Sequence, residues 1–260
     1  ASPFDSKQLQ QRYPGCEFNQ FDGAEKMAEK YGVSRDDLDQ FAWQSHMKGK
    51  AAYDANRFDA ELIKFDVELT LEGKTQTVRH EMDEGLRPNA TLEAVAGLQP
   101  LREGGLITAG NASQVCDGAS ALLIMSEKAM KAAGLKPLAR IHAMTVVGSD
   151  PTMVLEGPIP ATQKLLKQTG LSIDDIDLYE VNEAFGSVPL AWVNAMGADI
   201  NKLNVNGGAQ ALGHPLGATG TKLMATLVYE LRRRQGKYGL LAICEGLGTA
   251  DATLIERCSD

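Results

Sequence analysis

The second half of the chain alternates short apolar runs with amphipathic stretches that end in glycine. The run Gly118–Met125, GASALLIM, is continuously apolar, which is typical of a strand buried on both faces. The pattern predicts strands at 118–125, 138–147, 176–181 and 240–244, with 240–244 as the final core strand, and helices at 126–133, 160–169 and 219–234. Alternation of this kind predicts a layered α/β domain whose functional sites lie at the ends of strands.

The first hundred residues have a different character, which is mainly helical and polar. Ser34 followed by Asp37 predicts the N-cap of a helix, and apolar residues recur at helical spacing after it. Residues 64–80 alternate apolar and polar side chains around Glu72-Gly73-Lys74, which predicts a hairpin. A short helix is expected at 91–96.

Composition excludes several classes of function. The chain has 260 residues, 43% of them hydrophobic, which suits one or two packed domains. Its net charge of −8 argues against a nucleic-acid or anionic-lipid partner, and no apolar run is long enough to span a membrane. The cysteines and histidines lack CxxC, HxxxH and HExxH spacings, so no metal site is predicted. Sparse, unclustered cysteines suit a reducing compartment, and the cytosol is the expected location.

Three segments carry side chains suited to chemistry. His214 precedes Pro215 in the glycine-rich stretch NGGAQALGHPLGATG, where it suits a general base or an oxyanion donor; the alternative is a histidine satisfied by loop carbonyls. Cys244 ends the apolar run LLAIC, where it is either core or a thiol that exchanges a proton if its pKa is lowered. Asn182 opens NEAF at a strand-to-helix junction, where it can orient a water or cap the helix.

Taken together, the segments form a recognisable set. They are GLITAGNAS at 105–113 with Asp-Gly-Ala at 117–119, NEAF at 182–185, NVNGGAQALGHPLGATG at 204–220 and Cys-x-Gly at 244–246. With these segments and their spacings the sequence resembles the thiolases, the family of acetyl-CoA acetyltransferases and 3-ketoacyl-CoA thiolases. The stretch YGVSRDDLDQFAWQSH at 31–46 also resembles that family's helical domain over the CoA site. The resemblance covers nearly the whole chain.

The resemblance implies both a fold and a reaction. The fold is a thiolase-like layered αβαβα arrangement, which places the helical loop domain at 1–117, the last strand and helix of the N-terminal half at 118–136, and the C-terminal domain at 137–260. The reaction is a ping-pong acyl transfer: thiolytic cleavage of a 3-ketoacyl-CoA, or the reverse Claisen condensation with acetyl-CoA, in the metabolism of fatty acids or of a sterol side chain.

The resemblance also implies roles for individual residues. His214 would activate a nucleophilic thiol and donate to the thioester oxygen, while Asn182 would hold a water of the oxyanion hole. Cys244 would move the α-carbon proton, and Gly246 would lend a backbone N–H to the oxyanion. A further set would bind substrate and CoA: Arg87, Ala109, Ser113, Ala184 and Phe185. For Arg87 the alternative is a solvated surface side chain. Coenzyme A is then a substrate, no cofactor is permanently bound, CoA thioesters are the ligands, and a homodimer or homotetramer is expected.

Two departures from the family pattern affect these expectations. The family's nucleophile lies in a Cys-x-Ser segment of a preceding α/β domain, and neither Cys16 nor Cys116 has that context. We therefore expect the chain to be the C-terminal two-thirds of a thiolase, working with an N-terminal segment in the same polypeptide or in a separate chain. Residues 154–156 and the ending CEGLGTA at 244–250 also depart from the pattern, which leaves acyl-chain specificity open.

Two other classes of protein compete with this interpretation, and the residues disfavour both. A non-catalytic module that binds CoA or lipid would have no use for Asn182, His214 and Cys244 together. A condensing enzyme of the ketoacyl-synthase kind typically carries two histidines, or a histidine and an asparagine, without this cysteine context.

Overall fold

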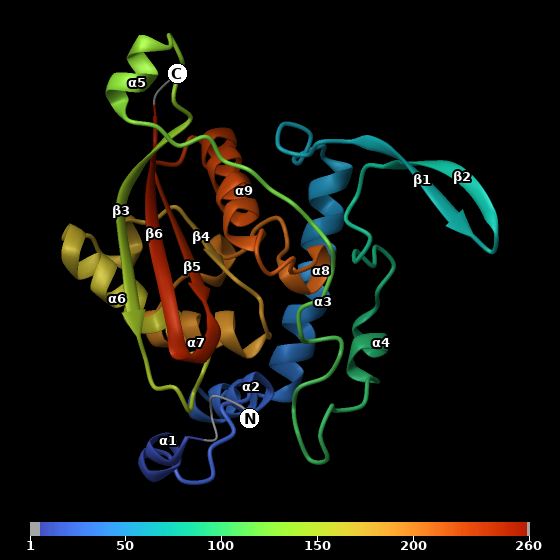
Figure 1. Ribbon diagram of the computed structural model, residues 1–260, viewed down its shortest axis with the longest axis vertical. Coiled ribbons are helices and arrows are strands. Elements are labelled where there is room, and N and C mark those ends of the chain that lie inside the picture. The colour runs from blue at the N-terminus through green and yellow to red at the C-terminus, as the bar shows by residue number, and fades with distance from the viewer. Residues whose placement is uncertain (1–5, 259–260) are drawn as a thin grey trace.

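The computed structural model describes residues 6–258, and a four-stranded sheet lies at its centre (Figure 1). The strand order is β3 (Ala139–Gly148), β6 (Thr249–Arg257), β5 (Tyr238–Cys244) and β4 (Leu178–Val181). β6 is antiparallel to both of its neighbours, whereas β4 and β5 run parallel. The C-terminal ends of β4 and β5 therefore lie at the same edge of the sheet, as expected for parallel neighbours.

Helices cover both faces of this sheet. The helices α6 (Pro158–Thr169) and α7 (Ser187–Met196) pack on one face, and α9 (Thr219–Arg234) packs on the other (Figure 1). The apolar side chains of Leu223, Leu227 and Leu231 face the sheet from α9, where they meet apolar side chains of β4, β5 and β6. Each such leucine contributes ~1.5–3 kcal/mol by leaving water. No helix in the described part of the chain is both long and apolar enough to cross a bilayer.

The N-terminal helices join the same core. After α1 (Lys7–Arg12), the helices α2 (Gln20–Lys30) and α3 (Arg35–Asp54) pack on α7 and on the short α8 (Ala209–Leu212), respectively. Met27 and Leu38 are fully buried in one apolar cluster with side chains of α6, α7 and the sheet. The capping box predicted at Ser34 and Asp37 is present at the start of α3.

The predicted hairpin is confirmed and projects from the body of the molecule (Figure 1). It consists of β1 (Phe65–Leu71) and β2 (Lys74–His80), joined through Glu72 and Gly73 with φ of 51° and 76°. Two successive positive φ values are those of a type I′ turn, which matches the twist of the strands. The predicted short helix forms as α4 (Leu92–Ala96), with Thr91 as its cap. Single 3-10 turns lie at Ile173–Asp175, Ile200–Lys202 and Gly246–Gly248.

Two predictions about strands are wrong. Residues 118–125 form no strand: the segment is extended but has no neighbouring strand among residues 6–258, and Leu123 and Ile124 are 80% and 67% exposed. The strand 240–244 is also not the last one, because β6 follows it and lies between β3 and β5. The helix predicted at 126–133 does form as α5 (Glu127–Ala132). The division into domains at 117 and 136 stays a prediction.

Candidate active site

The parallel strands β4 and β5 bring Asn182 and Cys244 to the same edge of the sheet. Asn182 directly follows β4, and its backbone N–H donates to the Ala242 carbonyl of β5 at 3.1 Å. Its side chain is 1% exposed, and its Oδ1 has no hydrogen-bond partner among the described residues. Cys244 is the last residue of β5 and is half-buried against the core. Asn182 does not cap α7, because Gly186 occupies the N-cap position.

The imidazole of His214 contacts two side chains. Its Nδ1 lies 2.6 Å from Thr219 Oγ1, and its Nε2 lies 3.4 Å from Asn182 Nδ2. The backbone N–H of His214 donates to the Gln114 carbonyl at 2.9 Å, which ties the loop to the segment after GNAS. The ring is therefore held by a hydroxyl and an amide, and the alternative of a histidine satisfied by loop carbonyls is not what the structure contains.

A buried carboxylate, Glu183, fixes the loop that carries His214. Glu183 Oε2 accepts from Ser45 Oγ at 2.8 Å and from the Gln210 backbone N–H at 3.1 Å, and its Oε1 accepts from Asn204 Nδ2 at 2.9 Å. Any side-chain carbon at Gly208 would overlap this carboxylate, so the residue there must be glycine. Glu183 thus joins NEAF, the glycine-rich stretch and α3, and burial raises its pKa while these donors oppose the rise. Sequence reasoning missed this role, although Glu183 lies inside a recognised motif.

The two titratable groups of the site have opposite pKa shifts. Burial and the nearby Lys222 cation lower the pKa of His214, so the imidazole is neutral with one lone pair available. Burial, together with the negative charges of Glu245 and Asp251, raises the pKa of Cys244 to about 12. The condition of a lowered pKa at Cys244 is therefore not met. A neutral imidazole can accept a proton, whereas the Cys244 thiol keeps one to donate.

The residues predicted to bind substrate occupy different settings. The Ser113 N–H donates to the Ala184 carbonyl at 3.0 Å, so GNAS and NEAF lie side by side, with Ala109 exposed on the same loop. The Phe185 ring packs on Phe21 in the core, with the ring centres 5.3 Å apart. The binding roles of these residues stay predictions.

Arg87 and Gly246 are both exposed. The Arg87 guanidinium donates to the Glu84 carbonyl at 2.9 Å within its own loop, and the Arg87 backbone N–H donates to His46 Nδ1 at 3.1 Å. A Cβ at Gly246 would meet nothing within 4 Å, so a ligand oxygen has room to approach its backbone. Their roles toward CoA and the oxyanion also stay predictions.

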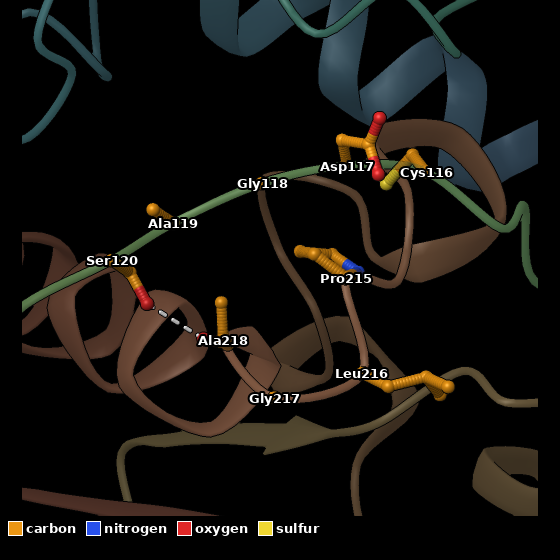
Figure 2. Close-up of a pocket in the computed structure, with 9 residues that line it drawn as sticks. All are labelled: Cys116, Asp117, Gly118, Ala119, Ser120, Pro215, Leu216, Gly217 and Ala218. Carbon is orange, nitrogen blue, oxygen red and sulfur yellow. Dashed lines mark hydrogen bonds between the residues drawn. The ribbon is translucent and has the colours of Figure 1, made fainter.

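An open hollow of about 400 Å³ lies beside the His214 loop (Figure 2). The extended segment 116–120 passes over residues 215–218 there, and Ser120 Oγ donates to the Ala218 carbonyl at 2.7 Å. Cys116 is exposed, and its Sγ lies against Gly213, 2.5 Å from where a Cβ would be. Sequence context argued against Cys116 as a nucleophile, yet the fold places this thiol next to the residue that precedes His214. Residues 6–258 contain no group of three or more His, Cys, Asp or Glu side chains arranged to hold a metal ion.

Two family models match the chain: "Thiolase, N-terminal domain" over residues 21–128 and "Thiolase, C-terminal domain" over residues 135–257. A steroid 3-ketoacyl-CoA thiolase, FadA6 of Mycobacterium tuberculosis, is 50% identical over 253 residues, which are 97% of this chain and 60% of that protein.

Solved structures of thiolase-family enzymes also resemble this chain. The Bacillus anthracis acetyl-CoA acetyltransferase has a TM-score of 0.87 at 38% identity and covers 92% of this chain. Human mitochondrial 3-ketoacyl-CoA thiolase in complex with CoA has a TM-score of 0.79 at 43% identity and covers 91% of it. The matches cover 60% and 58% of those two chains, so this chain spans about 60% of the length of its relatives.

Proposed function

The chain belongs to the thiolase family, and from that premise we propose that it carries the histidine, asparagine and cysteine side of a thiolase active site. The observation that carries the proposal is the contact between His214 and Asn182 at 3.4 Å, at the sheet edge where Cys244 ends the neighbouring strand. The reaction is the thiolytic cleavage of a 3-ketoacyl-CoA, or the reverse condensation, with CoA as a substrate.

The pKa shifts assign a direction of proton movement to each group. Neutral His214 takes the proton of a nucleophilic thiol, and the resulting thiolate attacks the 3-keto carbon of the substrate. The bond between C2 and C3 then breaks, and the acetyl-CoA enolate that leaves takes a proton from the Cys244 thiol. The Cys244 thiolate then takes the proton of the CoA thiol, and the CoA sulfur attacks the acyl group. The nucleophilic thiolate that leaves takes its proton back from His214, which restores both groups. Asn182, whose Oδ1 has no hydrogen-bond partner within residues 6–258, would position a water near the enolate oxygen.

We assign the nucleophile to an N-terminal thiolase segment, in the same polypeptide or in a second chain. The family resemblance supports this assignment, because neither Cys16 nor Cys116 lies in a Cys-x-Ser segment. Cys116 is the internal competitor, since its thiol lies next to the His214 loop. Incubation of the 260-residue chain with acetyl-CoA, followed by intact mass and peptide mapping, separates the two. An acyl group on Cys116 that is lost in Cys116→Ala would contradict our assignment.

The acyl group that we propose is bulkier than acetoacetyl, from a fatty acid or a sterol side chain. Two features support this: a steroid thiolase is 50% identical to the chain, and residues 154–156 depart from the usual family pattern. In this segment Val154 has φ of 57°, which is strained for a β-branched residue, and Glu156 accepts from the Tyr31 hydroxyl at 2.7 Å. Competition between short and bulky 3-ketoacyl-CoAs in one assay tests it. A strong preference for the four-carbon substrate would contradict it.

We further propose a cytosolic homodimer or homotetramer. Four unclustered free cysteines support a reducing compartment, and the exposed apolar side chains Phe65, Leu69 and Leu71 of β1 support contact with another copy. Light scattering on the purified complete protein measures the oligomer, and fractionation of the source cell gives the compartment.

The test of the function is a thiolysis assay on the complete protein. We expect acetyl-CoA and a shortened acyl-CoA as products. In His214→Gln we expect neither product, and no acyl-enzyme by mass spectrometry. His142→Gln, a histidine on the edge strand β3, is the matched control. Binding of CoA thioesters with no turnover of any 3-ketoacyl-CoA would favour the binding-module alternative.

A further inference from the structure

Thr219 is a buried hydroxyl that the proposed reaction does not use. It is the first residue of α9, lies five residues after His214 and is 2% exposed. Its Oγ1 lies 2.6 Å from His214 Nδ1 and 3.0 Å from the Pro215 carbonyl oxygen. Two hydrogen-bond partners therefore compete for one hydroxyl proton.

The chemistry of the two partners decides where that proton goes. A carbonyl oxygen can only accept, so the Thr219 hydroxyl donates to Pro215. Toward His214 the same oxygen has only lone pairs left, and the contact at 2.6 Å then requires a proton on Nδ1. A neutral imidazole with a proton on Nδ1 has its lone pair on Nε2.

The contact on the other side of the ring favours the same tautomer. Asn182 Nδ2 belongs to an amide NH₂ group, which only donates, and it lies 3.4 Å from His214 Nε2. An Nε2 that carried a proton would face another donor, whereas an Nε2 lone pair accepts from it. Two different residues, on opposite sides of the ring, thus favour the same arrangement.

Charge keeps the ring in this neutral form. Lys222 lies one turn further along α9, where its Nζ donates to the Leu212 carbonyl at 2.9 Å. The N-terminus of α9, with its partial positive charge, also lies at Thr219. Both disfavour a second proton on His214, in line with its lowered pKa.

We propose that Thr219 is a positioning residue that fixes His214 as the Nδ1–H tautomer, which leaves an unprotonated Nε2 to take the proton of the attacking thiol. This inference rests on the proposed function for its catalytic consequence, but the tautomer itself can be measured without any turnover.

The experiment compares three variants of the complete protein labelled with ¹⁵N-histidine. Thr219→Val removes the hydroxyl at nearly constant shape, and Thr219→Ser restores it. Thr169→Val is the matched control, because the Thr169 hydroxyl makes the same i to i−4 bond, to Leu165 at 3.0 Å, on α6. The His214 signals are assigned by their loss in His214→Gln.

In the unaltered protein, Thr219→Ser and Thr169→Val, we expect the ¹⁵N shifts of a protonated Nδ1 and an unprotonated Nε2. In Thr219→Val we expect the preference to be lost and kcat to fall on the order of 10- to 100-fold, as when a histidine loses its orienting partner, with KM little changed. Thr219→Ser should recover most of this activity.

Three results would overturn the inference: a protonated Nε2 in the unaltered protein, an unchanged tautomer in Thr219→Val, or an equal loss of activity in Thr169→Val. If the tautomer changes as expected but neither the unaltered protein nor any variant cleaves a 3-ketoacyl-CoA, the proposed function fails. The assignment of the tautomer to Thr219 then still stands.

Discussion

Asn182 links His214 to the sheet edge where Cys244 ends the neighbouring strand, and the surroundings of His214 and Cys244 shift their pKa values in opposite directions. Burial and Lys222 lower the pKa of the imidazole, while burial and two carboxylates raise the pKa of the thiol to about 12. Environments that push two pKa values apart are how one site holds both a base and an acid near neutral pH. At the scale of single residues this divergence, more than either motif, supports the roles assigned to the pair.

The first prediction concerns Cys244. In the complete protein, Cys244→Ser should lower both thiolysis and condensation by about 10²- to 10⁴-fold, the usual range for loss of a general acid or base. Transfer of an acetyl group from acetyl-CoA onto the nucleophilic cysteine should persist, because that half-reaction moves no α-carbon proton. Product formation and intact mass report the two steps. Cys258→Ser, just after β6, is the control, and near-normal condensation by Cys244→Ser would show that the assignment is wrong.

The second prediction concerns Asn182. Asn182→Ala should lower kcat on the order of 10²-fold with little change in KM, since a group that orients an oxyanion donor acts mostly in the transition state. Asn194→Ala serves as control, because Asn194 is exposed on α7 and its side chain donates to the Tyr31 carbonyl, away from the site. Steady-state kinetics on both variants decide the matter. An effect confined to KM would instead indicate that Asn182 shapes the binding surface.

At the scale of elements, periodicity correctly predicted the helices and strands whose pattern of burial is set within the element itself. The helix at 219–234 and the strand near 138–147 were predictable because the side chains that face the core repeat at the spacing of one element. Residues 118–125 read as a strand, but a strand needs a neighbour, and the described part of the chain supplies none. β6 escaped prediction because Asp251 and Thr253 interrupt its apolar pattern, although both lie between two partner strands.

The residues of the site also fall into two groups, those that the sequence predicted and those that only the fold showed. The motifs named Asn182, His214 and Cys244, because a family pattern marks the reacting groups. They did not show that Thr219 and Glu183 hold His214 and its loop, because those hydrogen bonds join residues from separate elements. Contacts of this kind appear only after the chain has folded.

The third prediction belongs to the β5–β6 ladder. Asp251 lies on β6, opposite Ile243 of β5, and burial together with the charge of Glu245 raises the pKa of Asp251 to about 6. An unfolded aspartate titrates near ~3.9, so the folded state binds the extra proton between pH ~4 and 6 and loses stability as pH rises through that window. Asp251→Asn removes this loss, so its gain in stability should be larger at pH 7 than at pH 4.5. Denaturant midpoints at both pH values measure it. Asp174→Asn, exposed before β4, is the control, and an equal change at both pH values would contradict the linkage.

At the scale of the whole molecule, one apolar cluster unites the N-terminal helices with the sheet. A second group of apolar side chains is exposed to solvent. The exposed side chains include Val115, Leu123, Ile124, Met144 and Val146, on the extended segment and on the edge strand β3. Their exposed fractions range from 61% to 92%. Soluble proteins rarely leave large contiguous apolar patches in water.

The fourth prediction follows from that surface. The 260-residue chain by itself should bind a hydrophobic dye and self-associate, whereas the complete protein should do neither to the same extent. The double variant Ile124→Glu with Met144→Glu should weaken dye binding. The control double variant Leu98→Glu with Leu101→Glu, at exposed positions before the GNAS loop, should change it less. Fluorescence titration and sedimentation measure both effects. A monomeric chain that binds no dye would contradict the prediction.

The β1–β2 hairpin lies outside the shared core, although the chain on each side of it is part of that core. The turn at Glu72 and Gly73 can therefore be opened without separating what it joins: Met27 and Leu38 come from before it, and Leu165 and Trp192 come from after it. Protease cleavage at this turn should leave a nicked protein whose two fragments co-purify. The same turn should accept an inserted fluorescent domain, which would make the hairpin a handle for following this protein inside a cell.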